Sequence, residues 1–310
     1  MHASRLMIAL LPLAAATASA QVMIAGGARP SVSRDGKWIT YSAAKNGDWD
    51  VYAVHPDGTG DRRLTNVAER NFVALGPPTW IGDRILIFRR INDTTRLSLV
   101  DLAGTPTELV SPGTHPNDVL FDARQLRPSS DGRRLVFLHG NPRRPRVAVS
   151  NVDGTGVHDL TDSTVLGVNP DWSRDGKHLA FTVMDSASHG QIAVVDADGK
   201  NYRVITHLDP ANGLPQWVNW APDGKRLVFQ VGIYNRQKIE ESNAHLWLLD
   251  LATGQATKLA PHAGMSLDET PSWFPDGKRI AFQSNRTGIL QVWTMNADGT
   301  DPRQVTGLHP

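Results

Sequence analysis

Short apolar runs separated by Asp-Gly pairs recur along most of the chain. In the last stretch, residues 279–283, 291–296 and 303–306 carry apolar side chains, and Asp-Gly pairs stand at 276–277 and 298–299. Because Asp-Gly between apolar runs tolerates the positive φ of a tight hairpin turn, each pair predicts two antiparallel strands. With a first strand ending near Trp273, this stretch predicts a unit of four antiparallel strands.

The same unit occurs six times, every 44 to 53 residues. Its most regular segment, residues 271–282, reads PSWFPDGKRIAF. Near copies lie at 30–41, 170–181 and 220–229; weaker ones lie at 80–88, which is one residue short, and at 129–137, which lacks the Trp. A single four-stranded sheet cannot cover both of its faces. Units at this period are therefore expected to stack radially into a propeller, with the recurring Trp and Phe or Tyr packed between blades.

These motifs resemble the TolB-type WD40-like repeat, which is found in the propeller of the periplasmic protein TolB and in the propellers of prolyl oligopeptidase-type peptidases. The resemblance covers roughly residues 30–306 and implies an all-β fold, a six-bladed β-propeller of four-stranded antiparallel blades. TolB carries an additional α/β domain and the peptidases a hydrolase domain. Neither is expected in residues 21–310, which are predicted to form a single propeller domain. Residues 21–25 and 303–306 compete for the outer strand that closes the ring.

Residues 1–20 are predicted to be a signal peptide. Arg5, an apolar stretch at 6–16 and Ala-Ser-Ala at 18–20 follow one another in the order typical of exported proteins. The alternative is a frayed apolar N-terminus on a cytosolic protein. The absence of Cys excludes disulfides, thiolate metal sites and a cysteine-linked lipid anchor, and no later run approaches the roughly 20 apolar residues of a membrane helix. A periplasmic protein without a membrane span is therefore expected.

The charge balance argues against a nucleic-acid partner. The chain has 32 Lys and Arg residues against 31 Asp and Glu, and removal of Arg5 with the signal peptide leaves it formally neutral. The densest basic cluster, Arg143, Arg144 and Arg146, lies among prolines in a predicted loop. Nucleic-acid binding normally requires a concentrated basic surface, so a solvated loop is the preferred interpretation.

The candidate binding residues lie in the longer connections between strands. If the strands of a blade are lettered a to d from the channel outwards, both Asp-Gly turns fall on one face, and the b-to-c and d-to-a connections fall on the other, here called the loop-bearing face. The longest b-to-c connection, residues 231–244, is either a solvated insertion or a binding loop; it holds Tyr234, Arg236, Lys238, Glu240 and Glu241. The d-to-a connections 110–124 and 207–216 add His115, Asp118, His207 and Asp209.

Two adjacent acids are the candidate metal ligands. Asp268 and Glu269 immediately precede the sixth strand a, at the expected mouth of the channel. Hard cations prefer several converging oxygen ligands, so Ca²⁺ in the channel is a hypothesis that requires oxygens from other blades. The alternative is a pair of solvated carboxylates.

The sequence contains no linear catalytic motif. There is no Gly-x-Ser-x-Gly elbow, His-Glu-x-x-His, phosphate loop or dinucleotide fingerprint. The first hypothesis is therefore a non-enzymatic binding or scaffold module of the cell envelope, and the resemblance to TolB implies an envelope protein or lipoprotein as partner. The alternative is a carbohydrate lyase or hydrolase with a site assembled at the channel mouth. A propeller that gates a separately encoded peptidase is a third interpretation.

Overall fold

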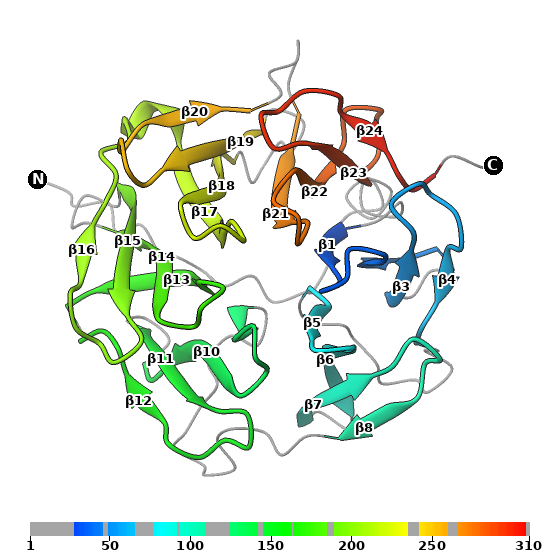
Figure 1. Cartoon of the computed structure of the whole chain (residues 1–310), viewed down its shortest axis with the longest axis horizontal. Coiled ribbons are helices and arrows are strands. Elements are labelled where there is room, and N and C mark those ends of the chain that lie inside the picture. Colours follow the sequence, from blue (N-terminus) through cyan, green and yellow to red (C-terminus); the bar gives the residue numbers. More distant parts are fainter. Residues whose placement is uncertain are drawn as a thin grey trace, which may run out of the picture.

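The computed structural model describes residues 28–45, 49–65, 77–91, 94–108, 125–141, 145–162, 164–184, 189–234, 242–259 and 266–307. These residues form six four-stranded antiparallel sheets, arranged as blades around a central channel (Figure 1). The predicted six-bladed, all-β propeller is thereby confirmed. The weaker repeats in blades 2 and 3 form complete sheets as well.

Each blade consists of four consecutive strands. Blade 1 comprises β1 (Ala28–Val32), β2 (Ile39–Ala43), β3 (Asp50–Val54) and β4 (Arg62–Arg63). Blade 2 comprises β5 (Thr79–Ile81), β6 (Arg84–Ile91), β7 (Thr94–Val100) and β8 (Pro106–Glu108). Blade 3 comprises β9 (Arg127–Pro128), β10 (Arg134–His139), β11 (Arg146–Asn151) and β12 (His158–Asp159).

The second half of the ring follows the same plan. Blade 4 comprises β13 (Leu166–Trp172), β14 (His178–Met184), β15 (Gly190–Asp196) and β16 (Arg203–Val204). Blade 5 comprises β17 (Leu214–Trp220), β18 (Arg226–Ile233), β19 (Asn243–Asp250) and β20 (Ala256–Lys258). Blade 6 comprises β21 (Asp268–Trp273), β22 (Arg279–Ser284), β23 (Gln291–Asn296) and β24 (Arg303–Gln304). A short 3-10 helix, η2 (Pro210–Asn212), precedes β17. No helix in the described part of the chain is long and apolar enough to cross a bilayer.

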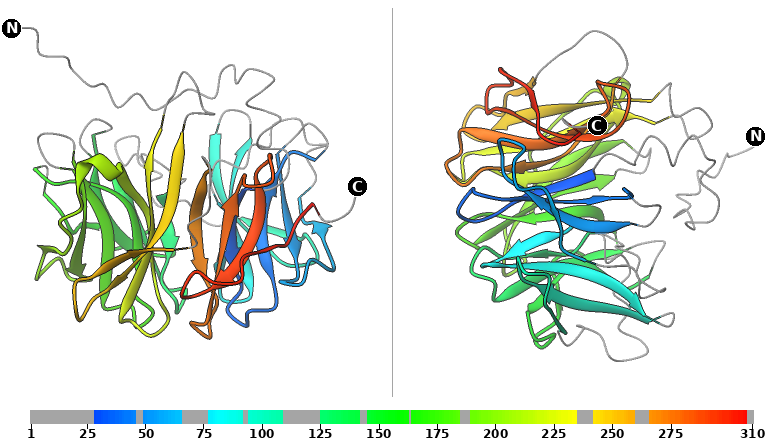
Figure 2. Two further views of the ribbon diagram at one scale, coloured as in Figure 1. Left: turned by 90° about the horizontal axis from the view of Figure 1, so that it is seen from above. Right: turned by 90° about the vertical axis from the view of Figure 1, so that its right-hand side faces the viewer.

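The Asp-Gly turns form as the sequence predicts. Gly277 has φ of 67° and Gly299 has φ of 86°, conformations that glycine adopts without steric cost. The Asp276 carboxylate accepts a hydrogen bond of 2.9 Å from the Lys278 N–H and so fixes the turn. These turns lie on one face of the ring, and the strand ends that lead into the b-to-c and d-to-a connections lie on the other (Figure 2).

The hydrophobic core is divided among the junctions between blades. Between blades 4 and 5, Ile192 and Val194 pack with Trp220 and Phe229. Phe229 is fully buried, and burial of such a side chain contributes about 2–3 kcal/mol. The recurring aromatic residues of the repeat therefore hold neighbouring blades together.

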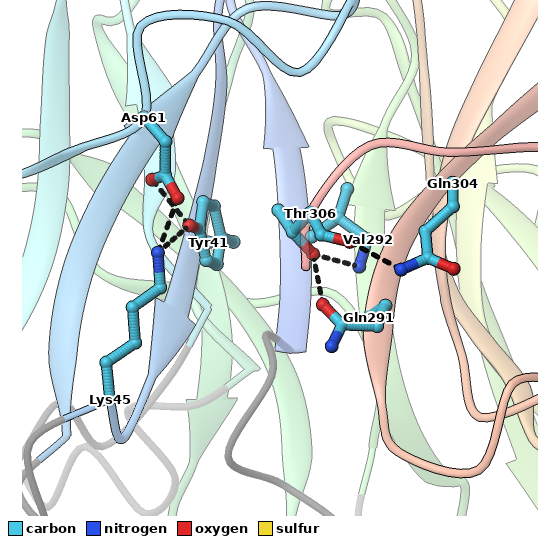
Figure 3. A network of polar contacts seen from close by, with 7 residues as sticks. All are labelled: Tyr41, Lys45, Asp61, Gln291, Val292, Gln304 and Thr306. Atoms are coloured by element: carbon cyan, nitrogen blue, oxygen red, sulfur yellow. Dashed lines mark hydrogen bonds and ion pairs between the residues drawn. The ribbon is translucent and has the colours of Figure 1, made fainter. Parts of the chain in front are cut away.

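A threonine just after strand d secures strand c in blades 1, 3, 4 and 6. Its hydroxyl accepts one N–H near the start of strand c, at 2.8 Å from Thr206 to Ile192 and at 3.0 Å from Thr306 to Val292. Thr306 also donates to the Gln291 side chain at 2.6 Å (Figure 3). The corresponding pairs in blades 1 and 3 are Thr65 with Val51 and Thr161 with Val147, both at 3.0 Å.

The ring closes between blades 1 and 6, and the four described strands of each of these blades are consecutive in the sequence. β24 pairs with β23, so the segment at 303–306 supplies an outer strand of blade 6, which is one of the two predicted alternatives. The other candidate, residues 21–25, lies outside the described residues. This junction, called the seam below, is held by packing of Tyr41 against Phe274 and its neighbours. The Val32 N–H also donates across the seam to the Ser272 hydroxyl at 3.1 Å.

Blade 1 carries its own polar contacts beside the seam. Tyr41 stands where other blades have Phe, and its hydroxyl donates to Asp61 at 2.6 Å. The Lys45 ammonium donates to both of these side chains (Figure 3). It also lies 4.3 Å from the centre of the Tyr52 ring. The one hydroxyl at this aromatic position is thus satisfied within its own blade.

Candidate binding site at the channel mouth

The inner strands of blades 1, 4, 5 and 6 share a bulge that faces the channel. At each bulge the pairing register shifts and one residue adopts positive φ: Arg29 at 58°, Asn169 at 52°, Trp217 at 53° and Thr270 at 48°. This conformation is uncommon for residues other than glycine and is strained for bulky or β-branched side chains. Such a backbone must be held in place by its surroundings.

Glutamine side chains of the preceding blade hold three of these bulges. The Gln283 carbonyl oxygen accepts the Arg29 N–H at 2.8 Å, and the Gln230 carbonyl oxygen accepts the Thr270 N–H at 2.8 Å. Gln125 accepts the Asn169 N–H in the same way. Each interaction joins adjacent blades at the channel wall.

Tyr234 and Glu269, predicted separately as binding and metal residues, meet at the loop-bearing mouth of the channel. The Tyr234 hydroxyl donates to Glu269 Oε1 at 2.7 Å, and Gln283 Nε2 donates to Glu269 Oε2 at 2.6 Å. Gln230 Nε2 donates to the Tyr234 oxygen at 2.7 Å. We call Gln230, Tyr234, Glu269 and Gln283 the mouth network. Through the Arg29 N–H it connects blades 5, 6 and 1.

The mouth network controls the protonation of its members. Burial raises the pKa of Glu269, and the hydrogen bonds from Tyr234 and Gln283 and the nearby Arg29 charge oppose this only in part. Burial and the Glu269 carboxylate hold the pKa of Tyr234 well above its ordinary value. Tyr234 is therefore a permanent donor to an acid that ionises reluctantly.

Asp268 makes a separate set of contacts. Its Oδ1 accepts from the Ser284 hydroxyl at 2.6 Å and its Oδ2 from Arg286 at 3.0 Å, in an ion pair whose side chains are 2% and 11% exposed. The Arg286 guanidinium also lies 4.9 Å from the Trp293 ring. Among the described residues, no group of three or more His, Asp or Glu side chains is arranged to hold a metal ion. Calcium binding at Asp268 and Glu269 stays a prediction.

The other predicted residues do not join the mouth network within the described residues. His207 and Asp209 are exposed, and Asp209 caps η2 by accepting the Ala211 N–H at 2.9 Å. Several predicted residues lie outside the described residues: Arg236, Lys238, Glu240, Glu241, His115 and Asp118.

Deeper in the channel lies a group that sequence reasoning missed. Asp171 of blade 4 accepts the Trp220 N–H and the Asn219 side-chain N–H of blade 5, each at 2.9 Å. Burial raises the pKa of Asp171 to about 6, although these hydrogen bonds and the Arg127 charge lower it. Arg127 of blade 3 lies 5.4 Å from the Trp217 ring of blade 5, so this pair spans two junctions of the ring.

The described part of the channel is narrow. The space lined by the inner strands of all six blades, including Arg127, Asp171 and Trp217, has a volume of about 100 Å³. Pockets that enclose small-molecule ligands typically begin near 300 Å³. A partner of any size is therefore expected to contact the mouth rather than to enter between the inner strands.

Comparison with known proteins agrees with this architecture. The TolB beta propeller domain, PD40, matches residues 129–308, more than half of the chain. The chain belongs to the TolB propeller family. It is 25% identical over 224 residues to an uncharacterized protein of Agrobacterium fabrum, covering 58% of this chain and 72% of the relative. It is 28% identical over 158 residues to a TolB homolog of Chlorobium chlorochromatii, covering half of this chain but only 32% of the homolog.

Solved structures with the same fold include TolB and enzymes. TolB from Acinetobacter baumannii superposes with a TM-score of 0.63 at 19% identity, over 93% of this TolB-family chain and 65% of that protein. Oligogalacturonate lyase from Vibrio parahaemolyticus has a TM-score of 0.56 at 14% identity, with coverages of 87% and 90%. A puromycin-hydrolyzing peptidase of Mycobacterium tuberculosis has a TM-score of 0.58 at 15% identity, with coverages of 94% and 55%. At these identities the likeness establishes the fold alone.

Proposed function

We propose that this TolB-family propeller is a non-enzymatic binding module of the periplasm, exported by a signal peptide at residues 1–20. Its partner is an envelope protein or lipoprotein, the class that the resemblance to TolB implies. The partner contacts the loop-bearing face at the channel mouth. We also propose the predicted loop residues, among them Arg236 and Lys238, as further contacts of the partner.

The mouth network is the observation that carries this proposal. It joins three blades through hydrogen bonds of 2.6–2.8 Å and fixes Tyr234 and Glu269 before a partner arrives. Such preorganisation lowers the entropy lost on binding. Tyr, Trp and Arg dominate the binding energy of protein interfaces, and the mouth network supplies one such residue, Tyr234.

The test is affinity capture from an envelope extract of the native organism, with partners identified by mass spectrometry. Tyr234→Phe removes the hydroxyl that holds Glu269, and we expect it to reduce recovery of the partner about tenfold, because ordering a released side chain on binding costs about 0.5–1.5 kcal/mol. Tyr202→Phe is the matched control, since Tyr202 lies in the turn between β15 and β16 on the opposite face. The control should capture as much partner as the wild type.

Equal recovery by both variants would place the partner away from the mouth network and contradict the proposal.

The second candidate function is a carbohydrate lyase or hydrolase at the channel mouth. It is favoured by the raised pKa values of Asp171 and Glu269, since catalytic acids are often tuned in this way. Turnover of oligogalacturonate or ester substrates by the purified protein, together with an empty capture, would establish that alternative.

A further inference from the structure

A groove crosses the seam on the turn-bearing face, opposite the channel mouth proposed for the partner. One wall comes from blade 1 and includes Lys37 and His55; the other comes from blade 6 and includes Arg279, Asn296 and Arg303. Its volume is about 930 Å³, within the range of small-molecule sites and well above that of the channel. The two ends of the propeller therefore meet at this groove.

Arg279 is the residue of this groove whose contacts differ from those of its equivalents in other blades. In the repeat it occupies the same position as Arg134 and Arg226, the first residue of strand b. Those two arginines reach the next blade: Arg134 donates to the Gly176 carbonyl at 2.6 Å and Arg226 to the Gly277 carbonyl at 3.2 Å. They also lie over the Trp of that blade, at 4.5 Å from Trp172 and 5.0 Å from Trp273.

Arg279 lacks both interactions because the seam differs from the other junctions. Blade 1 has Val32 where the next blade would present its Trp. The Arg279 guanidinium instead lies 4.1 Å from the centre of the Phe274 ring of its own blade. Within the described residues it forms no hydrogen bond or ion pair, although it is half-buried. A guanidinium carries five N–H donors in a planar fork that matches carboxylate and phosphate groups.

The other charges of the groove leave it able to accept an anion. Asp301 is paired with Arg303 at 2.9 Å, and Asp57 accepts from the hydroxyl and N–H of Thr59, which lowers its pKa. Lys37 is 74% exposed and only loosely paired with Asp35, at 3.8 Å. The acids are thus occupied locally, whereas Arg279 and Lys37, one in each wall of the groove, have donors to spare.

We propose that the seam groove is a binding site for a small oxyanionic ligand, whose phosphate or carboxylate group pairs with the Arg279 fork and with Lys37. Because the walls belong to the first and last blades, the bound ligand joins the two ends of the ring. Binding to the folded state alone stabilises it by mass action. Ligand binding and ring closure are therefore coupled.

The probes are inorganic phosphate and citrate, titrated into the full chain by isothermal calorimetry and thermal unfolding, with sodium chloride at equal ionic strength as the reference. We expect saturable binding of at least one probe and, near saturation, a rise in Tm on the order of 5 °C. The stronger probe identifies the oxyanion as phosphate or carboxylate.

Two variants make the test specific. Arg279→Gln should weaken binding at least tenfold, and Arg279→Lys should restore it only in part, because an ammonium keeps the charge and loses the fork. Arg203→Gln is the matched control: Arg203 holds in blade 4 the repeat position of Arg303 and is exposed outside the groove. No saturable binding of either probe, or equal weakening by Arg279→Gln and Arg203→Gln, would overturn the proposal.

Discussion

Asp171 occupies a position of the repeat at which the side chain accepts a hydrogen bond but need not be charged. At the same position Asn219 accepts the Trp273 N–H of the next blade at 3.2 Å, and Ser272 accepts the Val32 N–H at 3.1 Å. Neutral side chains therefore satisfy this position elsewhere in the ring. An acid placed there must be buried in its charged form, which is why the pKa of Asp171 rises to about 6.

Asp171→Asn should change the pH dependence of stability. The folded state binds the Asp171 proton more tightly than the unfolded chain, where the pKa is near 3.8, so its stabilising contribution is complete below pH 4 and is lost as the pH rises to 6. Relative to the variant, the free energy of unfolding of the wild type should fall by up to roughly 3 kcal/mol between pH 4 and 7. Urea unfolding across this range measures the difference.

Asp153→Asn supplies a control of opposite sign. Hydrogen bonds from Thr155 lower the pKa of Asp153, so its contribution is present above the unfolded pKa and is lost as the pH falls. If the difference between wild type and Asp171→Asn is independent of pH, Asp171 does not carry a raised pKa.

At the scale of elements, the turns and strands were predictable because their chemistry is local. Asp-Gly specifies a hairpin from two residues, and even the weaker repeats retained enough of it to form complete blades. The mouth network was only partly predictable. Tyr234 and Glu269 were both candidates, but their contact depends on how adjacent blades pack. Asp171 was missed because it lies within the recurring repeat motif, at a position that varies between blades and belongs to no functional sequence motif.

The threonine that secures strand c gives a test at this scale. Thr206→Val preserves shape but leaves the buried Ile192 N–H without its acceptor, which should lower the free energy of unfolding by about 1–3 kcal/mol. Thr257→Val on the exposed strand β20 is the matched control and should change it by less than about 0.5 kcal/mol. Equal effects in urea unfolding would mean that the hydroxyl contributes nothing specific.

At the scale of the whole molecule, five junctions join blades that are also linked by the chain, and the seam joins blades linked only by contacts. Arg29 and Thr270 allow a direct comparison, because each N–H donates to a glutamine of the preceding blade at 2.8 Å, the first across the seam and the second between blades 5 and 6. Any transient separation of the ring should begin at the seam.

Native-state hydrogen exchange should therefore be faster at Arg29 than at Thr270. After correction for intrinsic rates, we expect at least a tenfold difference, corresponding to about 1.4 kcal/mol in the free energy of local opening. A saturating oxyanion in the seam groove should reduce that difference. Identical protection of the two amides would show that packing of Tyr41 and Phe274 closes the seam as firmly as a peptide connection.

Because the four described strands of every blade are consecutive in the sequence, a duplication or deletion in the gene that spans a whole repeat leaves each of these remaining sheets intact. In a propeller whose last blade combines strands from both termini, the same duplication or deletion must leave the strands from the two termini able to pair with each other. Here the ring is free to change its number of blades by whole steps, provided that the first and last blades keep surfaces that fit. The repeat, rather than the domain, is the unit on which evolution of this molecule can act.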